Sequence, residues 1–224
     1  MAKEVTIKIK CAECEHENEV TIYAGLNAQV DTEKYVELLN GTLFNFDCAG
    51  CGKKGHLNYD MIYHDIVHRA VVHYVTNPDS LKKAKEAIET MKNLEGENAM
   101  PKDYTYRIVN SQNALREKAL LFNYGLDDRV MEILKGLSVS GAKKEHPDLQ
   151  IVEALYLTAH GKWMIQILGN KPMSAEVSMV KYDEIRRKLG DAIEDTEIRN
   201  YAVDVDWSIR ALQNPLAKFD NPQG

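Results

Sequence analysis

The stretches KCAEC, residues 10–14, and DCAGCGKKG, residues 47–55, contain all four cysteines of the chain. The cysteines form two C-x-x-C pairs separated by 33 residues: Cys11/Cys14 and Cys48/Cys51. Paired cysteines of this kind bind metals, carry out thiol redox chemistry or form disulfides. The residues around the two pairs distinguish among these uses, and they also indicate the fold of the N-terminal part of the chain.

The overall composition indicates a globular protein. The 224 residues are 44% hydrophobic and 28% charged, and a chain of this length can form one well-buried core with a smaller module beside it. No run of eighteen apolar residues is present, which excludes a conventional membrane span. The first ten residues alternate apolar and charged side chains and lack the apolar core of a secretory signal. We therefore expect a cytoplasmic protein without a membrane partner.

A reducing cytoplasm disfavours stable disulfides and favours metal binding by cysteine pairs. Each C-x-x-C pair brings two thiolates to one side of a tight turn, so two pairs supply the four ligands of a tetrahedral zinc site. The gap between the pairs exceeds the common spacing of about 15–20 residues, but the entropy of loop closure depends only weakly on loop length. Gly52 follows the second pair, where a left-handed backbone often lets an amide reach a thiolate. The sequence therefore predicts a zinc-ribbon-like structural zinc site with the ligands Cys11, Cys14, Cys48 and Cys51.

Two other kinds of cysteine site remain open at this point. One is a thioredoxin-like redox pair, although neither C-x-x-C motif opens a helix after a parallel strand in the expected element order. The other is a rubredoxin-like iron site, or a zinc site that changes with the redox state. When four thiolates bind one metal ion they leave no open position for water, so the pattern favours structural support over hydrolysis.

Short strands and one helix are expected around the cysteines. Alternating apolar residues predict strands at residues 5–9 and 18–24, one on each side of the first pair. Apolar spacing predicts a helix over residues 31–40, which Asp31 or Thr32 can cap and Gly41 can end. Later strands are expected at residues 42–47 and in a hairpin of residues 56–63 and 68–75 that turns near His64 and Asp65.

Asn77-Pro78 is the predicted boundary, because this dipeptide breaks a strand and Asp79 or Ser80 can cap a following helix. We expect a zinc-ribbon-like β module with an inserted short helix at residues 1–76 and a charged helix or linker at 77–98. A mixed helix and strand body follows at 99–224, either separate from the first module or continuous with it.

The body is expected to contain helices and strands in mixed order, which places the chain in the α+β class with an antiparallel module at its N-terminus. Helix and strand periodicities support this interpretation, and Gly125 and Ser111 suit the end and the start of one helix. The expected elements are a strand at 104–109, helices at 111–125 and 126–137, a hairpin at 149–169, a strand at 175–180, a helix at 183–193 and a mixed stretch at 202–213.

The charge distribution constrains the partners. The formal net charge is −6, and residues 1–76 hold seven Lys and Arg against eleven Asp and Glu. Nucleic-acid binding requires a basic surface, which neither part of the chain has. Acidic residues outnumber lysines around the cysteine pairs: Glu13, Glu15, Glu17, Glu19 and Asp47 against Lys8, Lys10, Lys53 and Lys54. We therefore expect a protein partner or a second copy of the chain rather than nucleic acid.

Candidate catalytic residues are few. His64 and His68 share a face of a strand or a helix, but no H-E-x-x-H motif or third ligand accompanies them, so a structural role for these residues and for His73 is favoured. Asp127 and Asp128 could bind Mg²⁺, although carboxylates at a helix start are also favoured by the helix dipole. The hairpin that carries His160 and Trp163 is the other place where an active site could lie.

The pattern around the pairs resembles the CpXC domain family, which is named after two C-P-x-C motifs. Ala12 and Ala49 stand where the family name has proline; proline stiffens the turn but does not bind metal, so the ligand assignment is unaffected. The resemblance supports metal binding by the four cysteines and implies no activity, because the family is functionally uncharacterised. It rests on CAECEHENEVTIYAGLN (11–27), LLNGTLFNFDCAGCGKKG (38–55), IYHD (62–65) and YRIVNSQNALREKALLFNYGLDDRVMEILK (106–135), and so extends over about two-thirds of the chain.

The favoured functional hypothesis is a non-enzymatic zinc-binding protein whose Cys₄ site supports a surface for another macromolecule. The alternatives are a nucleic-acid-associated zinc ribbon and an enzyme whose site lies in the C-terminal body.

Overall fold

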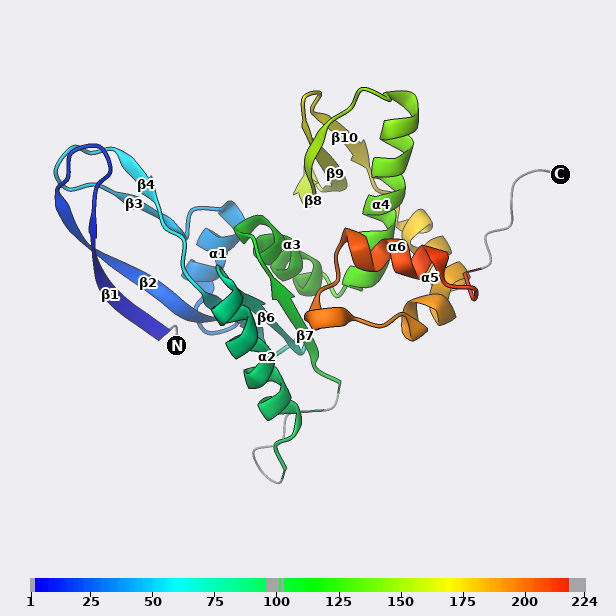
Figure 1. Ribbon diagram of the computed structural model, residues 1–224, viewed down its shortest axis with the longest axis horizontal. Coiled ribbons are helices and arrows are strands. Elements are labelled where there is room, and N and C mark those ends of the chain that lie inside the picture. The colour runs from blue at the N-terminus through cyan, green and yellow to red at the C-terminus, as the bar shows by residue number, and fades with distance from the viewer. Residues whose placement is uncertain (1–2, 96–100, 102, 218–224) are drawn as a thin grey trace. The chain divides into compact units, whose positions relative to one another are not determined.

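The computed structural model describes residues 3–95, 101 and 103–217. The chain divides into two compact units, residues 1–123 and residues 124–224, which we call the N-terminal and C-terminal units. Six α-helices and ten strands are assigned among the described residues (Figure 1), which confirms the predicted α+β class. No helix in the described ranges is long and apolar enough to cross a membrane.

The N-terminal unit is built on a five-stranded sheet with the order β1-β2-β5-β6-β7. Two antiparallel pairs, β1 with β2 and β5 with β6, are joined by a short parallel pairing of β2 with β5, and β7 adds to β6 in parallel. The strands are β1 (Lys3–Lys10), β2 (Glu17–Asn27), β5 (Met61–Asp65), β6 (Ala70–Tyr74) and β7 (Thr105–Val109). The antiparallel β1–β2 pair at the N-terminus agrees with the sequence analysis.

A second, two-stranded sheet is formed by β3 (Asn45–Asp47) and β4 (Lys54–His56). The two C-x-x-C pairs lie in the turns of the β1–β2 and β3–β4 hairpins. Figure 1 shows the two hairpins side by side, with their turns close together. The hairpins therefore bring the cysteines together although the chain between them forms β2 and a helix.

The described part of the N-terminal unit contains three α-helices: α1 (Thr32–Asn40), α2 (Pro78–Lys92) and α3 (Gln112–Asn123). Gly41 ends α1 with a φ of 72°, a left-handed conformation that glycine adopts without strain, as predicted. Ser111 caps α3, since its Oγ accepts a hydrogen bond from the Ala114 N–H at 3.0 Å. Residues of α1, α3 and the central strands share one apolar core, which includes Leu38, Phe44, Met61, Tyr63, Val72, Tyr74, Leu115 and Ala119.

The start of α2 differs in detail from the prediction. Asn77 is the N-cap, because its side chain accepts a hydrogen bond from the Ser80 N–H at 2.9 Å. The Ser80 hydroxyl instead donates to the Asp60 carboxylate. The β5–β6 hairpin is also shorter than expected, since β5 begins at Met61 and the turn occupies residues 66–69.

The compact units divide at a different place from the predicted boundary near residue 76. The segment after β6 forms α2, and the chain then returns as β7 to pair with β6 in the same sheet. The Asn77-Pro78 break is therefore a junction between a strand and a helix within the N-terminal unit. Residues 96–98 of the expected linker lie outside the described residues.

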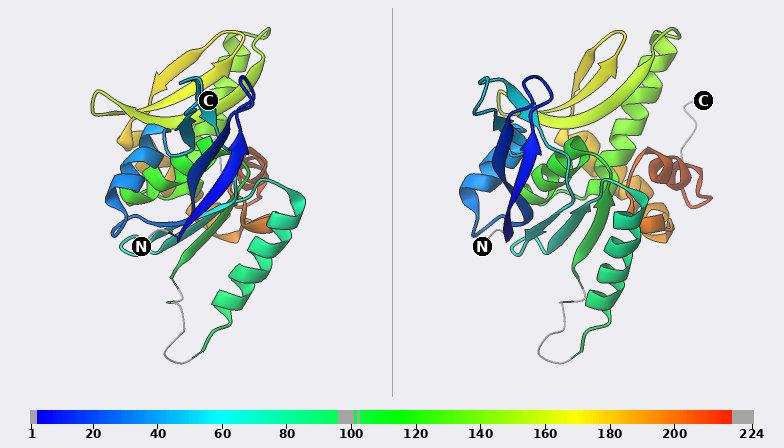
Figure 2. Two further views of the ribbon diagram at one scale, coloured as in Figure 1. Left: turned by 90° about the vertical axis from the view of Figure 1, so that its left-hand side faces the viewer. Right: turned by 60° about the vertical axis from the view of Figure 1, so that its left-hand side comes forward.

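The C-terminal unit combines an antiparallel sheet of order β10-β9-β8 with helices. His160 and Gly161 form the β8–β9 turn with φ values of 52° and 74°, as the sequence indicated. Trp207 on α6 is completely buried, and Figure 2 gives two further views of these elements. The elements are α4 (Asp128–Glu145), β8 (Ile151–Ala159), β9 (Lys162–Gly169), β10 (Met173–Glu176), α5 (Met179–Asp195), a 3₁₀ turn (Arg199–Tyr201) and α6 (Val205–Gln213).

Candidate metal centre

The first cysteine pair lies in a tight turn closed by two backbone hydrogen bonds. The Cys11 N–H donates to the His16 carbonyl at 2.9 Å, and the Glu15 N–H donates to the Cys11 carbonyl at 2.9 Å. Glu15 has a φ of 59°, in the left-handed region that is costly for residues other than glycine. The turn therefore depends on a strained residue directly after the second cysteine of the pair.

The second pair repeats this geometry. The Cys48 N–H donates to the Lys53 carbonyl at 2.9 Å, and the Gly52 N–H donates to the Cys48 carbonyl at 2.8 Å. Gly52 has a φ of 70°, as expected from its position after the pair. The two turns thus share one backbone pattern, and they differ in that glycine occupies the left-handed position only in the second.

The four sulfur atoms form one compact cluster, in which every Sγ lies within 4.8 Å of the others. Two approaches join the pairs, at 3.8 Å between the sulfur atoms of Cys11 and Cys51 and 3.6 Å between those of Cys14 and Cys48. A tetrahedral zinc site with Zn–S bonds of about 2.3 Å has S–S edges of about 3.8 Å. The spacing therefore fits a metal ion at the centre of the cluster, and all four cysteines are free of disulfides.

Asn18 connects the two turns, and sequence analysis did not identify it. Its amide nitrogen donates to the His16 carbonyl at 3.0 Å and to the Cys48 sulfur at 3.5 Å, while its oxygen accepts from the Ala49 N–H at 2.8 Å. The residue is buried, with 5% of its surface exposed. Its position in β2, between polar neighbours, gave no signal of this role, because its partners lie in both turns.

Close packing joins the turns at a second point. A side chain at Gly50 would place its Cβ 2.7 Å from the His16 side chain, so glycine is required for this approach. An exposed ion pair between Lys53 and Glu13, with 2.7 Å between the charged atoms, also bridges the turns. His16 therefore packs over the second turn, and none of its contacts described above makes it a metal ligand.

The protein atoms around the cluster shift the pKa values of two of its thiols, Cys48 and Cys14, in opposite directions. The pKa of Cys48 falls to about 6, because the backbone N–H groups of Cys51 and Gly50 and the Asn18 amide donate to its thiolate. The pKa of Cys14 rises to about 12: the His16 backbone lowers it, but desolvation and hydrogen bonds to the other three thiols outweigh that effect. The Cys48 thiolate forms readily and the Cys14 thiol then resists ionisation, so a cation favours the ionisation of both together.

The burial of the ligands differs across the cluster. Cys11 and Cys48, the first cysteine of each pair, are buried, and Cys14 and Cys51 are exposed. Four thiolates around one ion complete a tetrahedral shell and leave no position for a substrate or a water molecule. The cluster can hold a metal ion, and its chemistry is that of a closed site.

The histidines that the sequence analysis considered do not form a second cluster with metal-binding geometry among the described residues. His64 Nε2 lies 3.1 Å from the Tyr104 hydroxyl, and His68 Nδ1 lies 2.8 Å from an Asp65 carboxylate oxygen. His73 is buried in β6, and its Nε2 has no hydrogen-bond partner among the described residues. Burial lowers the pKa of His73 and that of His64.

The acidic helix start in the C-terminal unit has a structural role. Asp127 caps α4 by accepting the Arg129 N–H at 2.9 Å, and its carboxylate pairs with Arg129 at 2.7 Å and Arg186 at 3.1 Å. Glu194 on α5 contacts both arginines. Asp128 occupies the first turn of α4, where the helix dipole favours a carboxylate. This network links α4 to α5.

The hairpin proposed as an alternative active site also has an evident structural basis. His160 occupies the β8–β9 turn, and the Trp163 ring packs edge-on against Tyr124 with 4.9 Å between the ring centroids. Both residues are thus explained by the turn and by packing.

Comparison with known proteins agrees with the cysteine geometry. A family model described as CpXC protein matches residues 9–135, which include both cysteine pairs, the last two residues of β1, the strands β2 to β7 and the start of α4. No curated protein and no solved structure shows significant similarity to the chain. Since the match extends over more than half of the sequence, the chain belongs to the CpXC protein family.

Proposed function

We propose that the protein binds one structural zinc ion through Cys11, Cys14, Cys48 and Cys51, and that this site supports a surface for interaction with another protein. The observation that carries the proposal is the spacing of the sulfur atoms across the two turns, 3.8 Å and 3.6 Å. Thiolates are soft ligands, and a closed set of four suits zinc or iron rather than magnesium or calcium.

Zinc is preferred to iron on the basis of structural role. The two cysteine turns belong to separate sheets, and β3 and β4 have only three residues each. An isolated two-stranded hairpin is marginal in water, so a metal ion that joins it to the β1–β2 turn contributes directly to its stability. Zinc performs this task without redox chemistry.

A protein partner is favoured over nucleic acid by the charge near the turns. Glu13, Glu15, Glu17 and Glu19 are all exposed, and Lys53 and Lys8 are partly neutralised by the ion pairs with Glu13 and Glu17. Such a surface repels a phosphate backbone. The proposed role is therefore a non-enzymatic, metal-stabilised module that binds a protein or a second copy of itself.

Metal analysis of the purified chain tests the zinc proposal. We expect one zinc ion per chain by elemental mass spectrometry. Replacement of zinc by Co²⁺ should give the absorption of a tetrahedral thiolate complex. Cys14→Ser should reduce the zinc content strongly, whereas Ala12→Ser, which adds a hydroxyl to the same exposed turn, should leave it unchanged. Iron in stoichiometric amount would overturn the metal assignment, and a folded chain that binds no metal would overturn the whole proposal.

The partner class has a separate test. Light scattering of the zinc-loaded chain reports whether it self-associates, and titration with duplex DNA and single-stranded RNA at physiological salt reports nucleic-acid binding. Tight, salt-resistant binding to nucleic acid would contradict the expected preference for protein.

A further inference from the structure

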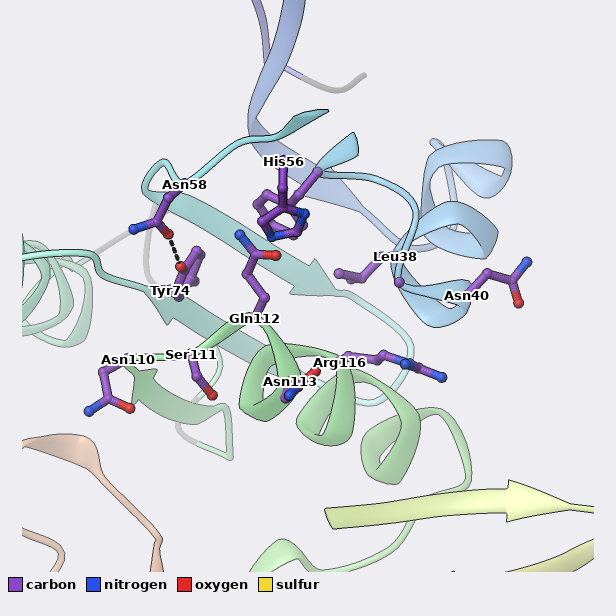
Figure 3. A pocket seen from close by; sticks show the side chains of 12 residues that line it. Leu38, Asn40, His56, Asn58, Tyr74, Asn110, Ser111, Gln112, Asn113 and Arg116 are labelled. Carbon is purple, nitrogen blue, oxygen red and sulfur yellow. Dashed lines mark hydrogen bonds between the residues drawn. The ribbon is translucent and has the colours of Figure 1, made fainter. Parts of the chain in front are cut away.

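A cavity of about 490 Å³ lies in the N-terminal unit, at the base of the β3–β4 hairpin and the start of α3. Figure 3 shows its lining side chains, with Gln112 reaching from α3 between Tyr74 and His56. The volume is that of a small-molecule site. The cavity is formed by the helix α1, the segment after β4, the strand β6 and the helix α3, so rigid elements position most of its wall.

The charges of the lining residues indicate which sign of charge a ligand should carry. Of the twelve lining residues none is Asp or Glu, although the chain carries a net charge of −6. The wall contains one full positive charge, on Arg116. The guanidinium lies beside the end of α1, where a Cβ at Gly41 would stand 3.3 Å from its nitrogen, and the structure gives it no carboxylate partner among the described residues. An anionic group is therefore the complement of this end of the cavity.

Two amide side chains in the wall, Asn58 and Gln112, already make hydrogen bonds within the protein. These bonds determine which of their donor and acceptor groups are left for a ligand. The Asn58 oxygen accepts from the Tyr74 hydroxyl, and in Figure 3 its nitrogen points away from Gln112 and His56. The Gln112 NH₂ group donates to the Leu57 carbonyl at 2.8 Å, so its oxygen remains as an acceptor.

His56 supplies a second acceptor. Its Nδ1 lies 2.8 Å from the Asn45 side-chain oxygen and donates to it in the neutral ring. Nε2 then carries the lone pair. The wall thus offers two acceptors, on Gln112 and His56, beside the cation of Arg116, which suits a ligand that carries hydroxyl donors as well as an anionic group.

Apolar atoms form slightly more of the lining than polar atoms do, but their total area is small. Leu38, Phe44 and Tyr74 line the cavity, but each is at most 4% exposed because their surfaces are buried in the core of the unit. A lipid or a large aromatic ligand would gain little from so small an apolar area, since hydrophobic stabilisation scales with the area removed from water. The lining therefore favours a ligand that binds through hydrogen bonds and charge.

We propose that this cavity binds a small polyhydroxylated organic anion, with its acidic group at Arg116 and its hydroxyl groups at Gln112 and His56. Sugar phosphates and sugar acids share this chemistry. The proposal is independent of the metal, because none of the cavity residues is a cysteine ligand.

Calorimetric titration of the metal-loaded full chain with four probes tests the proposal: glucose 6-phosphate, gluconate, glucose and inorganic phosphate. We expect glucose 6-phosphate or gluconate to bind, and the stronger of the two identifies the acidic group. The stronger of the two should bind more tightly than glucose or inorganic phosphate. Absence of binding by the two organic anions, or equal binding by glucose, overturns the proposal. Equal binding by inorganic phosphate also overturns it, because the hydroxyl contacts would then contribute nothing.

Matched variants locate the binding. Arg116→Gln should weaken the preferred anion about tenfold or more, because it removes a charge-assisted hydrogen bond. Arg187→Gln, at an exposed arginine of the C-terminal unit, should not change the affinity. Asn58→Asp, which adds a negative charge to the lining, should also weaken binding of an anion. Melting curves and zinc content should match those of the unmodified chain; unchanged affinity in both cavity variants would place the ligand elsewhere and overturn the proposal.

Discussion

The Asn18 amide donates a hydrogen bond to the Cys48 sulfur at 3.5 Å, across 30 residues of sequence. The same side chain accepts the Ala49 N–H and donates to the His16 carbonyl. One buried amide therefore fixes the second cysteine turn against the first before any metal ion is considered. Groups that orient metal ligands in this way commonly affect metal affinity as strongly as a ligand contact does.

Asn18→Ala should weaken metal binding about 10–100-fold, because it removes the hydrogen bonds that position Cys48 and the Ala49 backbone. Competition with a chromophoric chelator measures this affinity. Asn123→Ala, at an exposed asparagine at the end of α3, is the control and should have no effect. Unchanged metal affinity in Asn18→Ala would show that the cysteine turns are positioned without this amide.

The left-handed residues after the two pairs should respond in opposite directions to substitution. Gly52→Ala should destabilise the metal-loaded chain by about 1 kcal/mol, because an L-residue is strained at its φ of 70° and no neighbouring atom would otherwise obstruct the Cβ. Glu15→Gly should relieve the same strain at a φ of 59° and leave stability equal or higher. Thermal melting of both variants compares them, and a clear loss of stability in Glu15→Gly would contradict this account.

Burial of His73 predicts a stability change in mildly acidic solution. Because burial lowers the pKa of His73 below its usual value of 6.5, the unfolded chain binds a proton more readily than the folded chain. The contribution of the neutral ring is complete above that value and is lost as the pH falls from about 6.5 toward the lower folded-state pKa. His73→Leu should therefore reduce the loss of stability between about pH 7 and pH 5.

The titration of His73 must be distinguished from the release of metal in acid. Metal binding by thiolates is itself weakened by acid, so the informative quantity is the difference in unfolding free energy between the variant and the unmodified chain at each pH. Both proteins contain the same cysteines, and that contribution cancels. A difference that does not change with pH would exclude His73 as the titrating group.

Asp127→Ala should destabilise the C-terminal unit by about 1–2 kcal/mol, because it removes the cap of α4 and the ion pairs with Arg129 and Arg186. Hydrogen exchange should show faster exchange at the first turn of α4. Asp183→Ala, at an exposed position of α5, is the control. A normal exchange rate in Asp127→Ala would remove the structural explanation of this carboxylate.

Local signals in the sequence were sufficient for the elements near the cysteines. Period-two alternation identified β1 and β2, and Gly41 marked the end of α1. The left-handed Gly52 was also predictable, because glycine is the residue that adopts this conformation without strain. Its counterpart Glu15 was not, since nothing in a glutamate indicates a positive φ; only the backbone hydrogen bonds that the two turns share reveal it.

Long-range pairings were beyond the sequence. The parallel pairings of β2 with β5 and of β6 with β7 depend on connections through α1 and α2, and the periodicity of a strand does not encode its neighbour. For this reason the break at Asn77-Pro78 was interpreted as a domain boundary. The role of Asn18 was hidden in the same way, because both turns must be placed before its partners are known.

The sulfur approach between Cys11 and Cys51 has a mechanical consequence. With a metal ion in the cluster, the 40-residue interval between these cysteines becomes a closed loop that contains β2 and α1. Tension applied to the two ends of the chain then passes through metal–sulfur bonds and cannot extend this loop until one of them breaks. Once both bonds to one cysteine pair have broken, about 140 Å of hidden length would be released, at about 3.5 Å per residue, which force spectroscopy can resolve and which removal of the metal should abolish.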